Sequence, residues 1–417
     1  MSSSSLYRRL HGVFNLPRSS AAKSNKLNPL PLSSSTNEPS HSPPSSPTNK
    51  PRKSKPTAGS ASAATLLTVE HRLQKLVSKF IKSSESERFR ARHGIFDSTV
   101  RRLAVHKKFS MIEDLIEAQK KYDDITDEGF AIRLIMLYGK AGMFSHARKL
   151  FDELPELNCE RTVKSFNALL ASCVNAKEYD QVETIFRDVP EELSIEANVI
   201  SYNIVINAYC EMDALDKAIL FFNNMEKNGM EPDLVTFNTL LAAYYRKGHF
   251  LDAENMWSVM ENKNLAPNLI SYNARLRGMV QEERLQEGIG LLAEMEEKEI
   301  KPNVSSYNAL IKGFCDDGNL EEAKKWYYKL KEKEATPNRS TYRALLPLLT
   351  GQGDFDMALE LCKEAIDNRL VINAAEVQRV VDGLVEASKI EEASDLVQLC
   401  NSNNYLNFKL ELPQTST

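Results

Sequence analysis

A pattern that recurs every 35 or 36 residues constrains the fold of this 417-residue chain more than any other feature. Three residue series share this period: an aromatic residue followed by Asn, a Pro followed by Asp or Asn, and a small residue. The series are Phe166-Asn167, Tyr202-Asn203, Phe237-Asn238, Tyr272-Asn273 and Tyr307-Asn308; Pro232, Pro267, Pro302 and Pro337; and Ala147, Ala218, Ala253, Gly288, Ala323, Ala358 and Ala393. The repeats cover 128–162, 163–198, 199–233, 234–268, 269–303, 304–338 and 339–373, with weaker ones at about 94–127 and 374–408.

Each repeat contains two stripes of apolar residues with helical spacing. In residues 199–233 the stripes are Tyr202, Val205, Ile206 and Tyr209, then Leu215, Ala218, Phe221, Phe222 and Met225. Other repeats place a Gly between the stripes, where a helix end favours a residue that tolerates positive φ. We therefore predict an all-α fold, a right-handed α-solenoid of about eight or nine helix-turn-helix repeats.

The first part of the chain differs in composition from the repeats. Residues 1–69 hold nine Lys/Arg and one acid, Glu38, whereas the remaining residues hold 44 basic and 56 acidic side chains, a net charge of −12. We predict a transit peptide and disordered Ser/Pro-rich linker at 1–60, a helical cap at 61–93, the solenoid at 94–408 and a tail at 409–417. Arg8-Arg9 favours a mitochondrial address over a chloroplast one, and a basic cytosolic tail is the alternative.

The repeat begins with V-x-[ST]-[YF]-N-x-L-[IL] and ends with [EK]-x-x-x-x-P-[DN], a pattern that resembles the pentatricopeptide repeat family. Residues 199–233 are close to that family's consensus, and the likeness covers about 94–408. The uniform repeat length is similar to that of the P-type branch, which is mostly organellar. The resemblance implies a groove, lined by the first helices, that binds single-stranded RNA at one base per repeat.

The resemblance also assigns candidate RNA-binding residues. In the family, the residue after the aromatic and the last residue of the repeat read each base, which here gives Asn167 with Asn198, Asn203 with Asp233, Asn238 with Asn268, Asn273 with Asn303, and Asn308 with Asn338. Such pairs favour pyrimidines, because Asn offers a donor and an acceptor at short reach. Ile200, Val235 and Ile270 would pack against bases, and Lys140 and Arg246 would face phosphates.

Other features oppose or reinterpret this assignment. Glu211 and Asp316 place acids in the same groove, and repeats 128–162 and 339–373 lack the Asn, having Ile132 and Arg343 instead. The Asn and Asp residues could serve only as helix caps and stop signals. The competing function is a protein-interaction scaffold without an RNA groove.

The sequence favours no catalytic or metal site. None of the seven His lies in the last 168 residues, and the six Cys never cluster at metal-ligand spacing. We expect no enzyme activity, cofactor or small-molecule substrate, and no membrane insertion, since no apolar run approaches about 18 residues. Short family members include mitochondrial ribosomal proteins, so the expected partners are single-stranded or ribosomal RNA and mitochondrial ribosomal proteins.

Overall fold

The computed structural model describes residues 58–403, 405, 406 and 408–413, and every regular element in them is a helix. The predicted transit peptide and linker lie almost entirely outside these residues. No described helix is long and apolar enough to cross a membrane. The chain divides into two compact units, Met1–Gln181 and Val182–Thr417.

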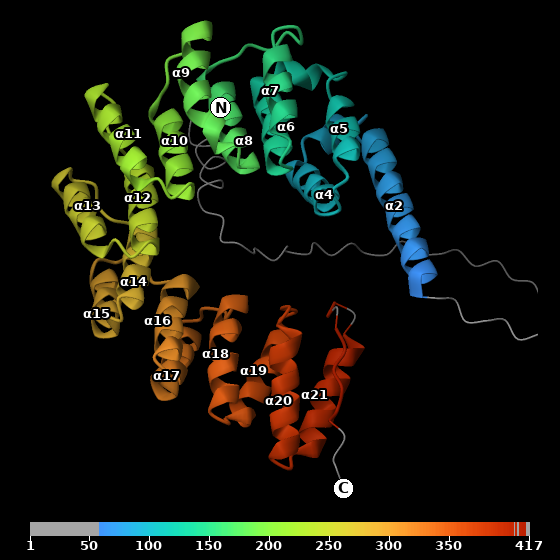
Figure 1. The fold of residues 1–417 in the computed structure, drawn as a ribbon, viewed down its shortest axis with the longest axis vertical. Coiled ribbons are helices and arrows are strands. Elements are labelled where there is room, and N and C mark those ends of the chain that lie inside the picture. Colours follow the sequence, from blue (N-terminus) through green and yellow to red (C-terminus); the bar gives the residue numbers. More distant parts are fainter. Residues whose placement is uncertain (1–57, 404, 407, 414–417) are drawn as a thin grey trace, which may run out of the picture. The chain divides into compact units, whose positions relative to one another are not determined.

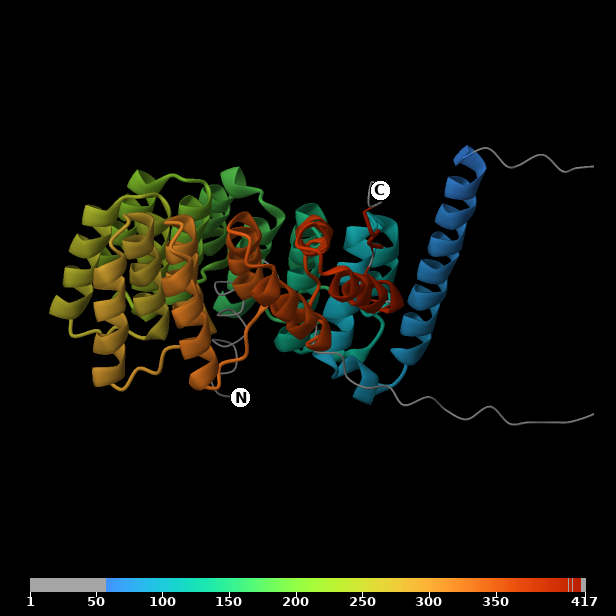
Figure 2. The same ribbon diagram turned by 90° about the horizontal axis from the view of Figure 1, so that it is seen from below.

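The first unit contains two packed helix pairs, with α2 and the short α3 before them and α8 after them (Figure 1). Its elements are α2 (Ala58–Ser83), α3 (Glu87–Arg90), α4 (His93–Val105), α5 (Phe109–Glu117), the 3-10 turn η1 (Asp123–Thr126), α6 (Glu128–Lys140), α7 (Phe144–Glu153), α8 (Val163–Ala176) and the 3-10 turn η2 (Tyr179–Gln181). α4 pairs with α5 and α6 with α7, while α8 packs on α6. The long α2, the blue helix in Figure 2, begins at Ala58, just before the region 61–93 predicted as a cap, and it packs against α5.

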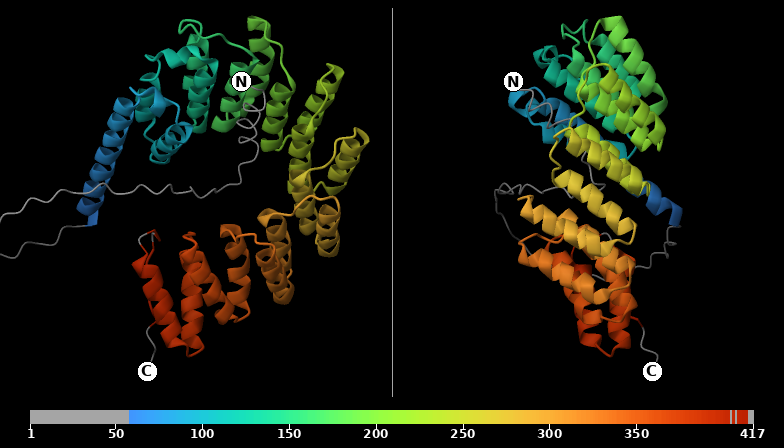
Figure 3. Two further views of the ribbon diagram at one scale, coloured as in Figure 1. Left: turned by 180° about the vertical axis from the view of Figure 1, so that it is seen from behind. Right: turned by 90° about the vertical axis from the view of Figure 1, so that its left-hand side faces the viewer.

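The second unit contains six helix pairs. Its elements are α9 (Val182–Leu193), α10 (Val199–Glu211), α11 (Leu215–Lys227), α12 (Leu234–Arg246), α13 (Phe250–Asn262), α14 (Leu269–Gln281), α15 (Leu285–Glu297), α16 (Val304–Asp316), α17 (Leu320–Glu332), α18 (Arg339–Gly351), α19 (Phe355–Asp367), α20 (Ala374–Glu386) and α21 (Ile390–Ser402). The first helices of successive pairs stack on one another from α10 to α20. Figure 3 shows the repeats side by side, and in Figure 1 α11, α13 and α15 cover the outer side of α10, α12 and α14. The predicted helix-pair solenoid is thereby confirmed.

Local residues fix where these helices begin and turn. Each first helix from α10 to α20 follows an Asn or Asp whose side chain accepts a backbone N–H of the first turn, an interaction typically worth about 1 kcal/mol. At the turn inside a repeat, Gly142, Gly248, Gly318 and Gly353 adopt φ between 73° and 78°. Asp213 and Glu283 adopt positive φ at the same place in their repeats.

Small residues allow the helices to approach closely. The six alanines of the small-residue series are completely buried. Between neighbouring first helices, a Cβ on Gly278 would lie 2.1 Å from the Tyr245 ring, so this contact requires glycine. Tyr245 and Arg275 both bind Glu254, with a distance of 2.9 Å from Arg275 Nε to Glu254 Oε1. These contacts tie consecutive repeats together, as the stability of a solenoid requires.

Repeat 163–198 departs from the regular pattern. Its first helix, α8, belongs to the first unit and its second helix, α9, to the second. The other second helices begin at the seventeenth residue of the repeat, but here that residue is Tyr179, in the 3-10 turn η2, and the α-helix starts at Val182. Val182 occupies the slot that alanine or glycine fills elsewhere, and its larger side chain is buried. This repeat has 36 residues instead of 35 and has Val182 in place of a smaller residue. Both differences occur in the repeat whose second helix begins irregularly.

Candidate nucleic-acid interface

Four of the five predicted base-reading pairs lie within the second unit, and the structure brings the members of each pair together. In every case, Nδ2 of the Asn inside the first helix donates to Oδ1 of the residue that ends the repeat. The distances are 3.0 Å for Asn203–Asp233, 3.3 Å for Asn238–Asn268, 3.4 Å for Asn273–Asn303 and 3.1 Å for Asn308–Asn338. The groups form one polar site per repeat.

The two members of a pair have different local roles. The residues that end the repeats are N-caps, as the purely structural interpretation requires: Asp233 Oδ1 accepts the N–H groups of Val235 and Thr236, both at 3.0 Å. The Asn of the first helix caps no helix start, and Asn203 is only 2% exposed. Asn is a weak helix former, so a buried Asn at the same place in successive helices needs an explanation beyond helix capping.

The fifth predicted pair, Asn167 with Asn198, falls on two different units. Asn167 lies in α8, where it is 1% exposed. Asn198 is the N-cap of α10, and its Oδ1 accepts the N–H of Ser201 at 3.2 Å. The pairing of these two residues stays a prediction.

The predicted base-packing residues are only partly accessible. Ile200 and Ile270 are half-buried, whereas Val235 is buried. Each lies three residues before a pairing Asn and therefore on the same side of its helix. Ile200 and Ile270 retain aliphatic surface that a base could cover.

Both predicted phosphate-binding cations are already ion-paired. Lys140 Nζ lies 2.7 Å from Asp97 Oδ1, and an Arg246 guanidinium nitrogen lies 3.3 Å from Glu211 Oε1. Surface pairs of this kind are worth only about 0–1 kcal/mol, so a phosphate could displace the acid. Within the described residues, Arg277 makes no hydrogen bond or ion pair; its surface is exposed, although desolvation by the surrounding side chains lowers its pKa, and an arginine stays charged near pH 7 all the same.

Arg277 is a candidate that the sequence analysis did not identify. It lies four residues after Asn273, on the same face of α14, and its charge is not neutralised by a neighbouring acid. In the next repeats, Lys312 on the same face pairs with Asp316, while exposed Arg343 forms no pair within the described residues. The sequence shows only that these residues are basic. The contacts in the structure show which of them are paired with an acid and which are not.

The repeats outside residues 199–338 form different contacts where the Asn pairs would lie. In the last repeat, Gln378 Nε2 donates to the backbone oxygen of Glu411 at 2.8 Å. The side-chain amide of Gln378 is therefore bonded to the C-terminal tail. In repeat 128–162, Glu128 accepts the Thr162 hydroxyl at 2.6 Å and the Ser165 N–H at 3.1 Å. Neither arrangement resembles the Asn pairs.

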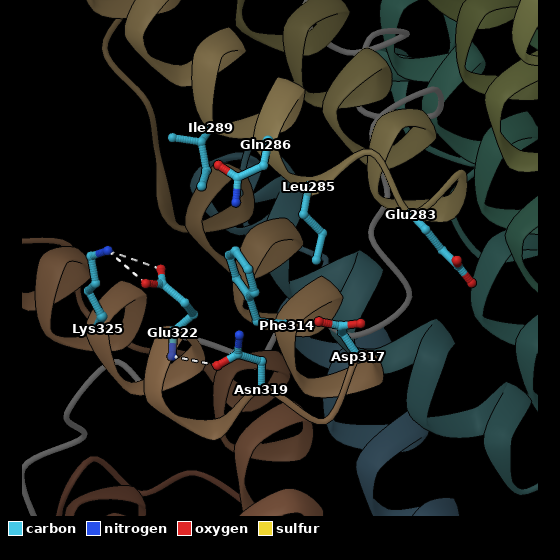
Figure 4. Close-up of a pocket in the computed structure, with 9 residues that line it drawn as sticks. All are labelled: Glu283, Leu285, Gln286, Ile289, Phe314, Asp317, Asn319, Glu322 and Lys325. Atoms are coloured by element: carbon cyan, nitrogen blue, oxygen red, sulfur yellow. Dashed lines mark hydrogen bonds and ion pairs between the residues drawn. The ribbon is translucent and has the colours of Figure 1, made fainter.

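A hollow of about 520 Å³ opens at the other end of α16 (Figure 4). Leu285 and Phe314 line it together with Glu283 and Asp317, and Lys325 at its rim is paired with Glu322 at 2.8 Å. α16 has 13 residues, which places the hollow about 20 Å from the cap of that helix. The unpaired carboxylates of Glu283 and Asp317 would repel phosphate, so the lining of this hollow disfavours nucleic acid.

The described residues offer little for catalysis. No three His, Cys, Asp or Glu among them gather as a metal site. Burial raises the pKa of all six Cys thiols, to about 11 or 12, so these thiols are neutral near pH 7 and poor nucleophiles. The polar sites described above are suited to binding through hydrogen bonds.

The chain has sequence relatives in Arabidopsis thaliana. The chain is 45% identical over 169 residues to the Arabidopsis thaliana small ribosomal subunit protein mS78 (rPPR3a), which covers 40% of this chain and 42% of the relative. It is 44% identical over 223 residues to the A. thaliana pentatricopeptide repeat-containing protein At3g13150, covering 54% of this chain and 39% of the relative. The chain thus spans about two fifths of the length of these relatives.

A solved structure and several family models also resemble parts of the chain. The crystal structure of the maize pentatricopeptide repeat protein PPR10 aligns with 74% of this chain and 53% of its own length, at 19% identity and a TM-score of 0.47. Models of the PPR repeat family match residues 197–243, 232–280, 267–316 and 302–350, a pentatricopeptide repeat domain model matches 149–212, and a PPR repeat model matches 133–159. The matches run continuously from residue 133 to residue 350, and the chain belongs to the pentatricopeptide repeat family.

Proposed function

We propose that this protein is a non-catalytic, single-stranded RNA-binding repeat protein that acts in mitochondrial RNA metabolism or translation. The observation that carries this proposal is the recurrence of one polar site per repeat, in which an Asn, buried in three of the four repeats and half-buried in the fourth, lies beside the cap of the next first helix. Equivalent sites on stacked helices present evenly spaced hydrogen-bonding groups, as reading one base per repeat requires.

The chemistry of the caps supports a preference for pyrimidines. Asp233 has only acceptor oxygens, which suit the N3–H of uracil. Asn268 Oδ1 is held by the N–H groups of Ile270 and Ser271, at 3.0 and 3.2 Å, so its Nδ2 donors remain to meet N3 of cytosine. A site with Asp therefore favours U, and sites with Asn accept C or U.

The charges support binding of modest strength. Arg246 is partly neutralised by Glu211, whereas Arg277 and Arg343 form no ion pair within the described residues. Phosphate neutralisation dominates the affinity of most nucleic-acid binders, so few free cations mean weak binding to naked RNA. A short pyrimidine-leaning groove is better suited to RNA that is already held in place by a particle.

This reasoning favours the mitochondrial ribosome as the site of action. Two relatives at 45% and 44% identity are named as small ribosomal subunit proteins, mS78 and mS79. We extend that assignment to this chain, with ribosomal RNA and mitochondrial ribosomal proteins as partners. The mitochondrion is the proposed location, and the chloroplast is the alternative.

The groove is tested by replacing Asn203, Asn238 and Asn273 together with Ala. Losing about 1 kcal/mol at each site should weaken binding to a uridine-rich 20-mer about 100-fold, measured by fluorescence anisotropy. The matched control replaces three exposed Asn on second helices, Asn223, Asn224 and Asn262. Unchanged affinity and unchanged pyrimidine preference in the first variant, with helix content intact, would refute the groove.

A protein-interaction scaffold is the second candidate function. The hollow at the end of α16 favours it, because an apolar floor beside unpaired carboxylates suits a basic side chain of another protein. Sedimentation of an organellar extract tests both functions with the triple Asn variant. Comigration of the variant with a ribosomal subunit would assign attachment to protein contacts, whereas its loss from that fraction would assign it to RNA.

A further inference from the structure

Each Asn in the polar sites accepts a hydrogen bond from a hydroxyl of the following repeat. The donor is always the Ser or Thr at the third position of the next first helix, which also belongs to the capping box there. The Oγ–Oδ1 distances are 2.6 Å for Thr236–Asn203, 2.6 Å for Ser271–Asn238, 2.6 Å for Ser306–Asn273 and 2.7 Å for Thr341–Asn308. These four bonds are the shortest in their networks, and the hydroxyls are buried.

The network fixes which atom of the Asn amide is the oxygen. Asn303 Oδ1 must be an oxygen, because it accepts the backbone N–H groups of Ser305 and Ser306 at 3.0 and 3.2 Å. The atom of Asn273 that faces it must therefore be the nitrogen. The other amide atom of Asn273 is then the oxygen, which faces the Ser306 hydroxyl. The hydroxyl has its own acceptor role, because it accepts the Asn303 N–H at 3.1 Å.

The orientation decides what the Asn can offer to a ligand. One hydrogen of Nδ2 is used by the cap, and Oδ1 is engaged by the hydroxyl. The second hydrogen of Nδ2 on Asn203, Asn238, Asn273 and Asn308 has no acceptor among the described residues. Each Asn therefore keeps one donor for a ligand acceptor, such as O2, which uracil and cytosine share.

We infer that the third-position hydroxyls, Thr236, Ser271, Ser306 and Thr341, are positioning residues that set base selectivity by holding the Asn of the preceding repeat in its donor-presenting orientation. The inference deepens the proposed function and rests on it. Without the hydroxyl, the Asn amide loses the partner of its oxygen and is held only by the Nδ2 hydrogen bond to the cap, which is 3.3 Å in Asn238–Asn268 and 3.4 Å in Asn273–Asn303, so the amide turns more readily. A turned amide would present an acceptor, and the preference for pyrimidines would weaken.

The chain provides a matched control for the structural role of such a hydroxyl. Ser165 is also a buried third-position residue in a capping box, in which its Oγ accepts the Thr162 N–H at 3.1 Å. The fifth residue of the preceding repeat is Ile132, which has no amide to hold. Ser165→Ala therefore removes a capping box without disturbing an Asn.

The test compares the double variant Ser271→Ala/Ser306→Ala with Ser271→Thr/Ser306→Thr and with Ser165→Ala, in the full chain. Binding to 20-mers of pyrimidine and purine composition is measured by fluorescence anisotropy. We expect the pyrimidine-to-purine affinity ratio to fall about tenfold in the double Ala variant. The Thr variant should retain the ratio, since Thr236 and Thr341 already serve this role, and Ser165→Ala should leave it unchanged.

The outcomes separate this inference from the proposed function. If the unmodified chain binds neither RNA, both are overturned. If it prefers pyrimidines and the double Ala variant keeps the same ratio, the positioning role is wrong and the RNA-binding function stands. A ratio that falls equally in Ser165→Ala would assign the effect to loss of capping and would also overturn the positioning role.

Discussion

The four repeats of residues 199–338 and the two repeats after them share one backbone design but differ where the groove is expected. Every first helix from α10 to α20 has 13 residues and begins after an Asn or Asp cap. The first four carry Asn at the fifth position, whereas α18 carries Arg343 and α20 carries Gln378. The caps and the buried faces thus specify the helix pair, and the fifth position varies without disturbing it.

In repeat 374–408, the tail residues Leu410 and Glu411 bind the groups that take the place of the polar site. Gln378 binds both the N–H and the carbonyl oxygen of Glu411 in the tail, at 3.2 and 2.8 Å. Asn401 likewise holds both backbone groups of Leu410, whose side chain is buried. The tail thus packs on repeat 374–408 through the backbone groups of Leu410 and Glu411 and the buried Leu410 side chain.

The largest expected effect comes from breaking this end. Leu410→Ala removes a buried leucine and should cost about 2–4 kcal/mol in the stability of the last repeat. Faster hydrogen exchange confined to residues 374–402 would show it, while RNA affinity should not change. Leu412→Ala is the control. Leu412 is 41% exposed, so its replacement should lower the stability of the last repeat by less than about 0.5 kcal/mol. A loss of RNA affinity in Leu410→Ala would place the last repeat in the binding site.

Local rules explain why so much of the fold follows from the sequence. Apolar spacing, cap residues and glycines such as Gly248 act within a few residues, so the helix pairs and their ends are predictable. The Asn–cap pairs join residues 30 apart, and only the family resemblance anticipates them. The hydroxyl of Ser271 is visible in the repeat motif, but its bond to Asn238 requires the packing of two repeats.

The charge pattern of the groove is not predictable in the same way. Lys140 and Arg246 are basic in the sequence, but whether they are free depends on Asp97 and Glu211, 43 and 35 residues away. The tail also follows no repeat pattern, so the burial of Leu410 could not be anticipated. Both features depend on contacts between elements that sequence periodicity does not encode.

A smaller effect should come from changing the chemistry of one cap within the four regular repeats. Asp233→Asn keeps an N-cap, so stability should change little. It replaces acceptor oxygens by an amide that also donates, so the preference for U over C at one base should fall about fivefold, roughly 1 kcal/mol. The reverse change, Asn268→Asp, should shift its own base toward U. Competition between 20-mers that differ at a single position measures both shifts, and an unchanged ratio in both variants would exclude the caps from base reading.

The smallest effect concerns Arg277, an unpaired cation on the groove face of repeat 269–303. Arg277→Ala removes a charge with no acid beside it, so affinity should fall a few-fold and the slope of log K against log salt should lessen by about 0.7, the value for one phosphate on a single strand. Lys325→Ala changes the net charge equally, but it lies at the hollow and is paired with Glu322. Its slope should match that of the unmodified chain. Equal slopes for the two variants would mean that Arg277 acts only through net charge, and that the groove face of α14 does not contact the RNA backbone.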